Sequence, residues 1–118
     1  MKLVEALLES TEGRAIGSQL MRSGTSVGAN YRAACRGRSK AEFIAKLGIA
    51  QEEADESAFW MELIIEGGLM ERKLVKPLLE EANELTAIMT ASRKSALARS
   101  QLRIKDRRSE IQNLKSKI

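Results

Sequence analysis

Residues 39–66 read SKAEFIAKLGIAQEEADESAFWMELIIE, and this stretch decides the fold class. Its apolar and small residues recur at alternating steps of four and three: Phe43, Leu47, Ala50, Ala54, Ser57, Met61 and Ile64. That spacing puts all of them on one face of a helix that packs in a bundle. Ser39 and Glu42 form a capping box, and Gly67-Gly68 ends the pattern. The spacing therefore predicts a helix over residues 40–66.

The segments on either side show the same kind of spacing. We call such a row of apolar and small residues along one face of a helix a seam. The upstream seam, which begins after Arg14, contains Ile16, Leu20, Ser23, Val27, Asn30 and Ala34. We expect a kink at residues 23–26, with Ser26 capping a restart, and Gly37 in the left-handed conformation that ends a helix. The downstream seam predicts a long last helix through Leu74, Leu78, Ala82, Leu85, Met89, Ser92 and Ala96. Over residues 1–8 we expect a short apolar helix, and we expect residues 11–13 to break it.

The composition favours an all-α protein. Aromatic residues make up 3% of the 118 residues and proline occurs once, whereas good helix formers dominate. We expect an up-and-down antiparallel helical bundle with a shortened first helix. The bundle domain is predicted over residues 1–98 and a basic helical extension or arm over residues 99–118, where Ile104, Ile111 and Ile118 recur every seven residues.

Several residue types that common chemistries require are missing. The sequence has no histidine, so it lacks the commonest general base and metal ligand. The single cysteine, Cys35, has no partner for a disulfide, which favours a cytoplasmic location, and we expect it in or near the core. No apolar run is long enough to cross a membrane. We therefore predict a protein that is not an enzyme and holds no metal or cofactor.

Charge is distributed in blocks. Residues 14–46 carry seven bases and one acid, residues 51–84 carry three bases and ten acids, and residues 93–118 carry nine bases and two acids. This pattern indicates either a surface that binds polyanions or self-association between basic and acidic faces. For the first basic block, a third interpretation is an ordinary solvent-exposed face. The sequence favours this interpretation and polyanion binding about equally.

The candidate nucleic-acid-binding residues are the bases of the two positive blocks, and they would contact phosphates without reading sequence. They are Arg22, Arg32, Arg36, Arg38, Lys40, Lys46, Arg103, Arg107 and Arg108. Other tail bases, such as Arg99, would add to them. Aromatic residues are scarce in the first block, which contains Tyr31 and, on the seam of the next helix, Phe43, and this scarcity disfavours stacking of single-stranded bases.

Two stretches resemble a known family. Residues 16–30, IGSQLMRSGTSVGAN, and residues 37–50, GRSKAEFIAKLGIA, are similar to the four-helix-bundle proteins encoded in intervening sequences of bacterial large-subunit ribosomal RNA genes. That family includes the accessory variability determinant of diversity-generating retroelements. The matching positions are Gln19, Leu20, Arg22, Ser26, Val27, Asn30, Gly37, Ser39, Glu42, Phe43, Leu47 and Ala50, with Glu56 further along.

The resemblance, which covers about residues 14–95, implies a ring-like homo-oligomer, with a pentamer expected, and a nucleic-acid or reverse-transcriptase partner. Of the motif residues, we expect Asn30 to be a buried amide that fixes helix register. Gln19 and Ser26 are expected to satisfy the backbone around Gly24. Trp60 and Phe59 adjoin Met61, so one of the three must face outward, and we expect it to be covered at an interface.

Two hypotheses for the function follow. In the first, an oligomeric helical bundle binds nucleic acid, with RNA preferred, through its pooled basic surface and acts as an accessory factor to an enzyme such as a reverse transcriptase. In the second, the acidic helix and the aromatic pair dock a protein partner, and the chain is a scaffold with no nucleic-acid role.

Overall fold

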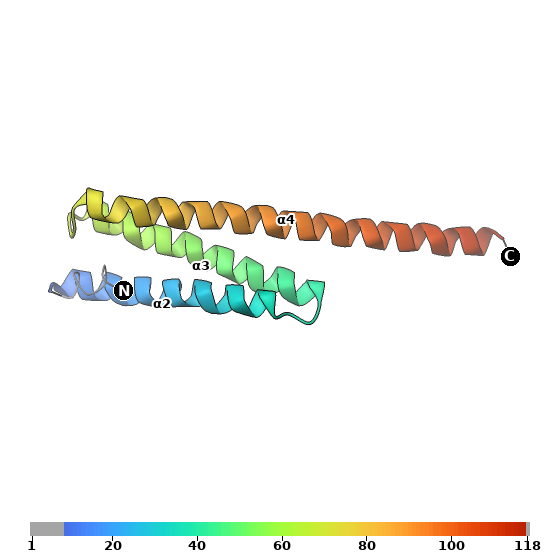
Figure 1. The fold of residues 1–118 in the computed structure, drawn as a ribbon, viewed down its shortest axis with the longest axis horizontal. Coiled ribbons are helices and arrows are strands. Elements are labelled where there is room, and N and C mark those ends of the chain that lie inside the picture. The colour runs from blue at the N-terminus through green and yellow to red at the C-terminus, as the bar shows by residue number, and fades with distance from the viewer. Residues whose placement is uncertain (1–8, 118) are drawn as a thin grey trace.

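The computed structural model describes residues 9–117, which form three helices. They are α2 (Thr11–Cys35), α3 (Lys40–Glu66) and α4 (Arg72–Ser116). Successive helices run up and down in antiparallel fashion, and α4 continues well past the other two, so the molecule measures 75 × 22 × 17 Å (Figure 1). The all-α, up-and-down prediction is confirmed for these helices. The helix expected over residues 1–8 lies outside the described residues.

Helix α3 is the centre of the packing. Both α2 and α4 pack along it, whereas α2 and α4 barely touch each other. The bounds predicted for α3 are confirmed, since it spans Lys40–Glu66 and Gly68 follows with φ of +65°. Six of its seven predicted seam residues are buried, and Phe43 is half-buried. A single central helix thus organises the core.

Small side chains set the approach of α2 to α3. Ser23 and Ser57 are both buried, and their hydroxyl oxygens lie 2.8 Å apart. Each hydroxyl also donates to a carbonyl of its own helix, Ser23 to Leu20 and Ser57 to Glu53. Ala50 and Ala54 add further small buried positions on α3. The two helices therefore lie close together without leaving a polar atom unsatisfied there.

The expected interruption of α2 is wrong. The helix begins at Thr11, with the Ser10 hydroxyl accepting from the Gly13 amide at 2.9 Å, and runs unbroken through Gly24. The Thr25 hydroxyl donates to carbonyls one turn back, at Met21 and Arg22, so it is satisfied without leaving the helix. Residues 11–13 are the first turn of the helix and not a break.

The connection between α2 and α3 differs in detail from the sequence prediction. Gly37 is not left-handed, because Gly68 is the one glycine with positive φ among the described residues. Gly37 is needed for space instead, because a Cβ there would lie 3.1 Å from the Ala34 carbonyl oxygen. The Ser39 cap of the Glu42 amide is confirmed at 3.1 Å, but the Glu42 carboxylate accepts from the Arg38 amide rather than closing the box on Ser39.

The seam predicted for α4 is wrong in part. Ala82 and Met89 are buried as expected, but Leu74, Leu78 and Leu85 are 55%, 43% and 40% exposed, and Ser92 is exposed as well. The buried position near the start of the helix is Val75. Because α4 packs on α3 and hardly on α2, one face of it is buried, and Leu78 and Leu85 face the open space beside α2. Helix α4 continues through Pro77.

Two other expectations meet different outcomes. Of the three adjacent large residues, Met61 is buried, Trp60 is half-buried against the core, and Phe59 is the outward one, 50% exposed. Cys35 is exposed, so its expected core position is wrong. It is the last residue of α2, where the helix ends and the connection begins.

Over residues 9–117 no helix has an apolar stretch long enough to cross a bilayer.

The close contact at Ser23 generates a prediction. Replacing Ser23 with Leu forces a large side chain into a site that holds a hydroxyl, and overpacking of this kind lowers the free energy of unfolding by about 1–3 kcal/mol. The same change at the exposed Ser18 of α2 should alter it by about 0.5 kcal/mol or less. Chemical denaturation of both variants measures the difference, and equal values would contradict the packing described.

Candidate nucleic-acid interface

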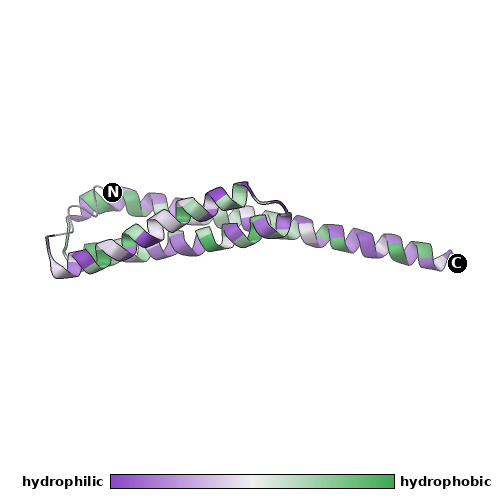
Figure 2. Cartoon of the chain, turned by 90° about the horizontal axis from the view of Figure 1, so that it is seen from below, coloured by the Kyte–Doolittle hydropathy of each residue, from purple (hydrophilic) through white to green (hydrophobic). Residues whose placement is uncertain are grey.

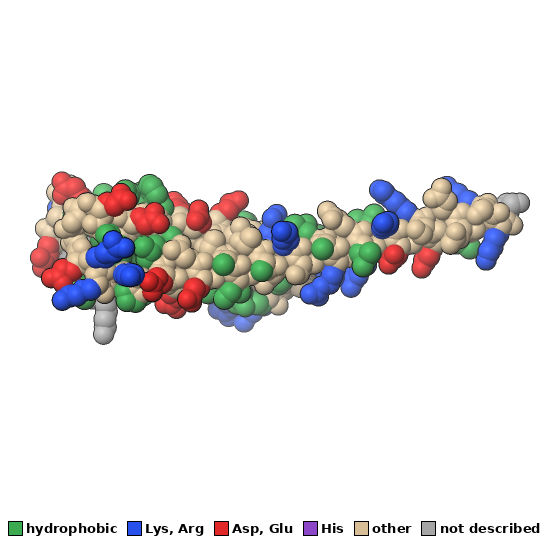
Figure 3. Space-filling view, turned by 90° about the horizontal axis from the view of Figure 1, so that it is seen from above, with side chains coloured by type: hydrophobic (Ala, Val, Ile, Leu, Met, Phe, Trp, Pro, Cys, Tyr) green, Lys and Arg blue, Asp and Glu red, His purple; other side chains and the backbone are tan. Residues whose placement is uncertain are grey.

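The charge blocks of the sequence become separate regions of the molecule. Acidic side chains gather on the bundle near its α3–α4 turn, and basic side chains stand out from the middle of α4 toward its C-terminal end (Figure 3). Between Glu84 and Asp106, α4 carries no acidic residue, although this interval contains the bases Arg93, Lys94, Arg99, Arg103 and Lys105. A long part of α4 is therefore purely cationic.

Three cations lie near enough to one another to interact electrostatically where α4 leaves the bundle, and we call them the basic fork: Lys40, Arg99 and Arg103. Lys40 is the first residue of α3, and the two arginines come from α4. Partial burial lowers the pKa of the Lys40 ammonium below its ordinary value, and the nearby positive charges of Arg103 and then Arg99 lower it further. No ion pair to any of the three occurs within residues 9–117.

The surroundings of the basic fork suit an anion. A hollow of about 410 Å³ beside it is lined by Phe43, Ala91, Ser92, Ser95, Ala96 and Arg99. The two serine hydroxyls are hydrogen-bond donors, and the N-terminal end of α3 adds a partial positive charge. The acid closest in sequence, Glu42, is occupied by the Arg38 amide. The arrangement can hold a phosphate group, and it offers no nucleophile paired with a base.

The other predicted bases lie around the basic fork or beyond it. Arg32 and Arg36 are exposed at the end of α2, Arg38 is exposed in the connection, and Lys46 is half-buried on α3. Arg107 and Arg108 are exposed farther along α4. None of these six has an ion pair among the described residues. They therefore extend the cationic surface from the fork in two directions.

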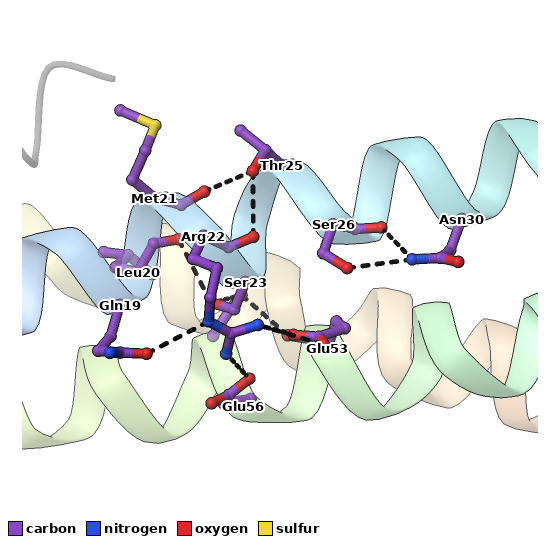
Figure 4. A network of polar contacts seen from close by, with 11 residues as sticks. Gln19, Leu20, Met21, Arg22, Ser23, Thr25, Ser26, Asn30, Glu53 and Glu56 are labelled. Carbon is purple, nitrogen blue, oxygen red and sulfur yellow. Dashed lines mark hydrogen bonds and ion pairs between the residues drawn. The ribbon is translucent and has the colours of Figure 1, made fainter.

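Arg22 has a different environment, because it lies in a cluster of carboxylates (Figure 4). Its guanidinium pairs with Glu53 at 3.2 Å and with Glu56, and its Nε donates to the Gln19 side chain at 3.2 Å. The hydrogen bond from Arg22 is the largest cause that holds the pKa of the Glu56 carboxyl below its ordinary value. Arg22 thus links α2 to α3, and its charge is compensated.

The motif residues have local roles that differ from those expected. Asn30 is half-buried and donates to the carbonyl and hydroxyl of Ser26, both on its own helix, so its expected role of fixing register between helices is wrong. Gln19 accepts from Arg22, and neither Gln19 nor Ser26 satisfies a backbone break at Gly24, because no break exists.

Ser92 and Ser95 line the hollow beside the basic fork, and no local sequence pattern singles them out for this position. Arg93 packs across Gly48 of α3, where a Cβ would lie 2.9 Å from the Arg93 Nε. The absence of acids from residues 85–105 was the signal that could have singled out this part of α4. Within residues 9–117, no group of three cysteine or acidic side chains is placed to bind a metal ion.

Comparisons with known proteins support one family. The model of the family described as 23S rRNA-intervening sequence protein matches residues 1–91. A crystal structure of a protein of unknown function from the S23 ribosomal protein family of Bacteroides thetaiotaomicron is similar, with 33% identity and a TM-score of 0.74. The similarity covers 79% of this chain and 86% of that one. No curated protein matches the chain.

The Arg22 cluster predicts a pH-dependent contribution to stability. Because Glu56 has a lowered pKa in the folded protein, the stabilisation is fully present above its unfolded value, near 4.5, and is lost as pH falls through the lower folded value. Arg22→Met should therefore lower the Tm at pH 7, and the difference from the unaltered protein should shrink below pH 4.5. A Tm difference that stays constant down to the lowest pH measured would contradict this role.

Proposed function

We propose a nucleic-acid-binding role for this chain, which belongs to the 23S rRNA-intervening sequence protein family. The basic fork of Lys40, Arg99 and Arg103 holds the phosphate backbone, and the bases along α4 extend the contact. The chain performs no reaction itself and holds the strand for a partner enzyme, such as a reverse transcriptase. The observation that carries the proposal is the grouping of three cations without an ion pair in the described chain.

The electrostatics of the basic fork favour an anionic ligand. Each positive charge raises the energy of the others, and a bound phosphate removes that repulsion. The pKa of Lys40 is lowered first by partial burial and then by the charges of Arg103 and Arg99. Binding of this kind releases counterions from the nucleic acid, so affinity falls steeply with salt concentration. It depends on the spacing of phosphates and not on base identity, because contacts to phosphates carry no sequence information directly.

A base-paired ligand fits the surface better than a single strand. Tyr31, 53% exposed near the end of α2, and Phe43, half-buried beside the basic fork, are the two aromatic residues within residues 14–46, so few platforms for base stacking exist there. The projecting helix offers a long row of cations suited to a rigid backbone. The family description names an intervening sequence of 23S rRNA, which is our reason for choosing structured RNA over duplex DNA.

Pooling of several copies would strengthen the interaction. A monomer of net charge +4 has a modest overall attraction for a polyanion, and repeated forks would multiply the number of phosphates contacted. The ring-like oligomer implied by the family resemblance, a pentamer in that expectation, remains part of this proposal.

The basic fork can be tested against a matched set of cations elsewhere on α4. When Lys40, Arg99 and Arg103 are replaced with Gln, the slope of log affinity against log salt concentration should become less negative by about two to three. Each lost phosphate contact reduces the magnitude of this slope by about 0.7–0.9. Replacing Arg72, Lys73 and Lys76 with Gln changes the net charge equally at the acidic end and should leave the slope nearly unchanged. Fluorescence anisotropy of a labelled RNA hairpin measures both variants.

Two results would contradict the proposal. Equal losses in the two variants would mean that net charge alone matters and that the fork is not a site. Absence of RNA binding by the unaltered protein at low salt would favour the alternative, a helical scaffold that docks a protein partner. Circular dichroism of both variants verifies that the helices are retained.

A further inference from the structure

An apolar groove runs between α2 and α4 over the surface of α3. It has a volume of about 520 Å³, and its lining includes Leu20 and Val27 of α2, Met61 of α3, and Leu78 and Leu85 of α4. Both leucines of α4 are substantially exposed, although their spacing resembles that of buried residues. Soluble chains rarely leave contiguous apolar surface of this kind uncovered, so the groove has the character of a docking surface for a further helix.

The projecting part of α4, residues 99–116, has exposed apolar residues but no surface of its own bundle to pack on. It is a helical rod of about 26 Å, and apolar positions recur along it (Figure 2). Leu102, Ile104, Ile111 and Leu114 are between 51% and 64% exposed. A single helix of this length is marginally stable in water when nothing packs on it. The projecting part therefore needs a surface that α2 and α3, as described, do not supply.

The spacing of the projecting part suits the groove. Leu97, Ile104 and Ile111 are seven residues apart and Leu114 follows after three, the pattern of a helix that packs in a seam between others. This stripe, residues 97–114, is about 26 Å long. The lining of the groove on α4 extends from Leu78 to Leu85, seven residues and about 11 Å. The interval from Ile104 to Ile111 has the same length, so these two isoleucines match the groove.

Charge complementarity identifies the partner as a second copy of this chain. Arg107 and Arg108 follow Ile104 by three and four residues, so they lie beside the stripe. Glu81 lines the groove, and Glu84 follows one turn later on α4. Residues 99–117 hold seven bases and two acids, whereas residues 51–84 hold ten acids and three bases. One end of the chain is therefore complementary to the other.

We propose that residues 97–114 of α4 in one copy dock into the α2–α4 groove of another copy, with Ile104 and Ile111 against Leu78 and Leu85 and with Arg107 and Arg108 facing Glu81 and Glu84. Pairing of two projecting helices with each other is disfavoured, because both are strongly positive. Reciprocal docking joins two copies, and head-to-tail docking that closes joins a ring of more. Arg99 and Arg103 of the basic fork belong to the docking segment, but they lie about 100–140° around the helix from Ile104, so the stripe docks while both stay exposed. Arg107 and Arg108 are common to this contact and to the proposed RNA surface.

A charge-exchange experiment tests the contact. The particle mass of the full chain is measured by sedimentation equilibrium, and the unaltered protein should give a multiple of 13.1 kDa. R107E/R108E should raise the dissociation constant of the oligomer at least tenfold, and E81R/E84R should do the same. The combination of all four substitutions restores opposite charges and should recover most of the affinity. This recovery is specific to the proposed pairing.

A matched control separates the proposed pairing from a general effect of charge. K46E/K105E changes the charge equally at positions away from both the stripe and the groove and should leave the mass unchanged. A monomeric unaltered protein would overturn the proposal and would indicate that a segment of the same chain covers the groove. Stronger association of R107E/R108E would also overturn it, because it would indicate that the projecting helices pair with each other. Circular dichroism excludes unfolding as the cause of dissociation.

Discussion

Close packing of two helices on one central helix is the constraint from which the other features of this molecule follow. The Ser23–Ser57 contact and the buried alanines of α3 bring α2 close to it, and Val75, Ala82 and Met89 bring α4 to it from another side. Because α2 and α4 hardly touch, an apolar groove stays open between them. Because α4 extends beyond the end of α3, a cationic helix projects from the bundle.

The environment of each cation decides what it can do. Arg22 is a base of the first positive block, yet two carboxylates of α3 compensate it and its role is to join helices. Lys40 belongs to the same block, but its neighbours are Arg99 and Arg103, and no carboxylate relieves their repulsion among the described residues. Folding therefore separates structural from available charges, which a count of lysines and arginines cannot do.

The sequence predicts what local rules govern and fails where distant segments meet. The bounds of α3 follow from its seam, its serine cap and its diglycine stop, all read within one segment. Gly24 suggested a kink, but packing on α3 and backbone bonding by hydroxyls override its low helix propensity. The α4 seam was misassigned because Leu78 and Leu85 share its periodicity while they face a groove that no local pattern reveals. The basic fork joins residues about sixty positions apart, and only the fold shows them together.

Side-chain NMR of the lysine and arginine resonances, free and bound to a short RNA duplex at neutral pH, tests the central claim most directly. The account predicts that the signals of Lys40, Arg99 and Arg103 change together on binding, while those of Arg22 and of Lys73 and Lys76 at the acidic end stay in place. Unchanged signals at the basic fork, or changes of equal size at Arg22, would contradict it.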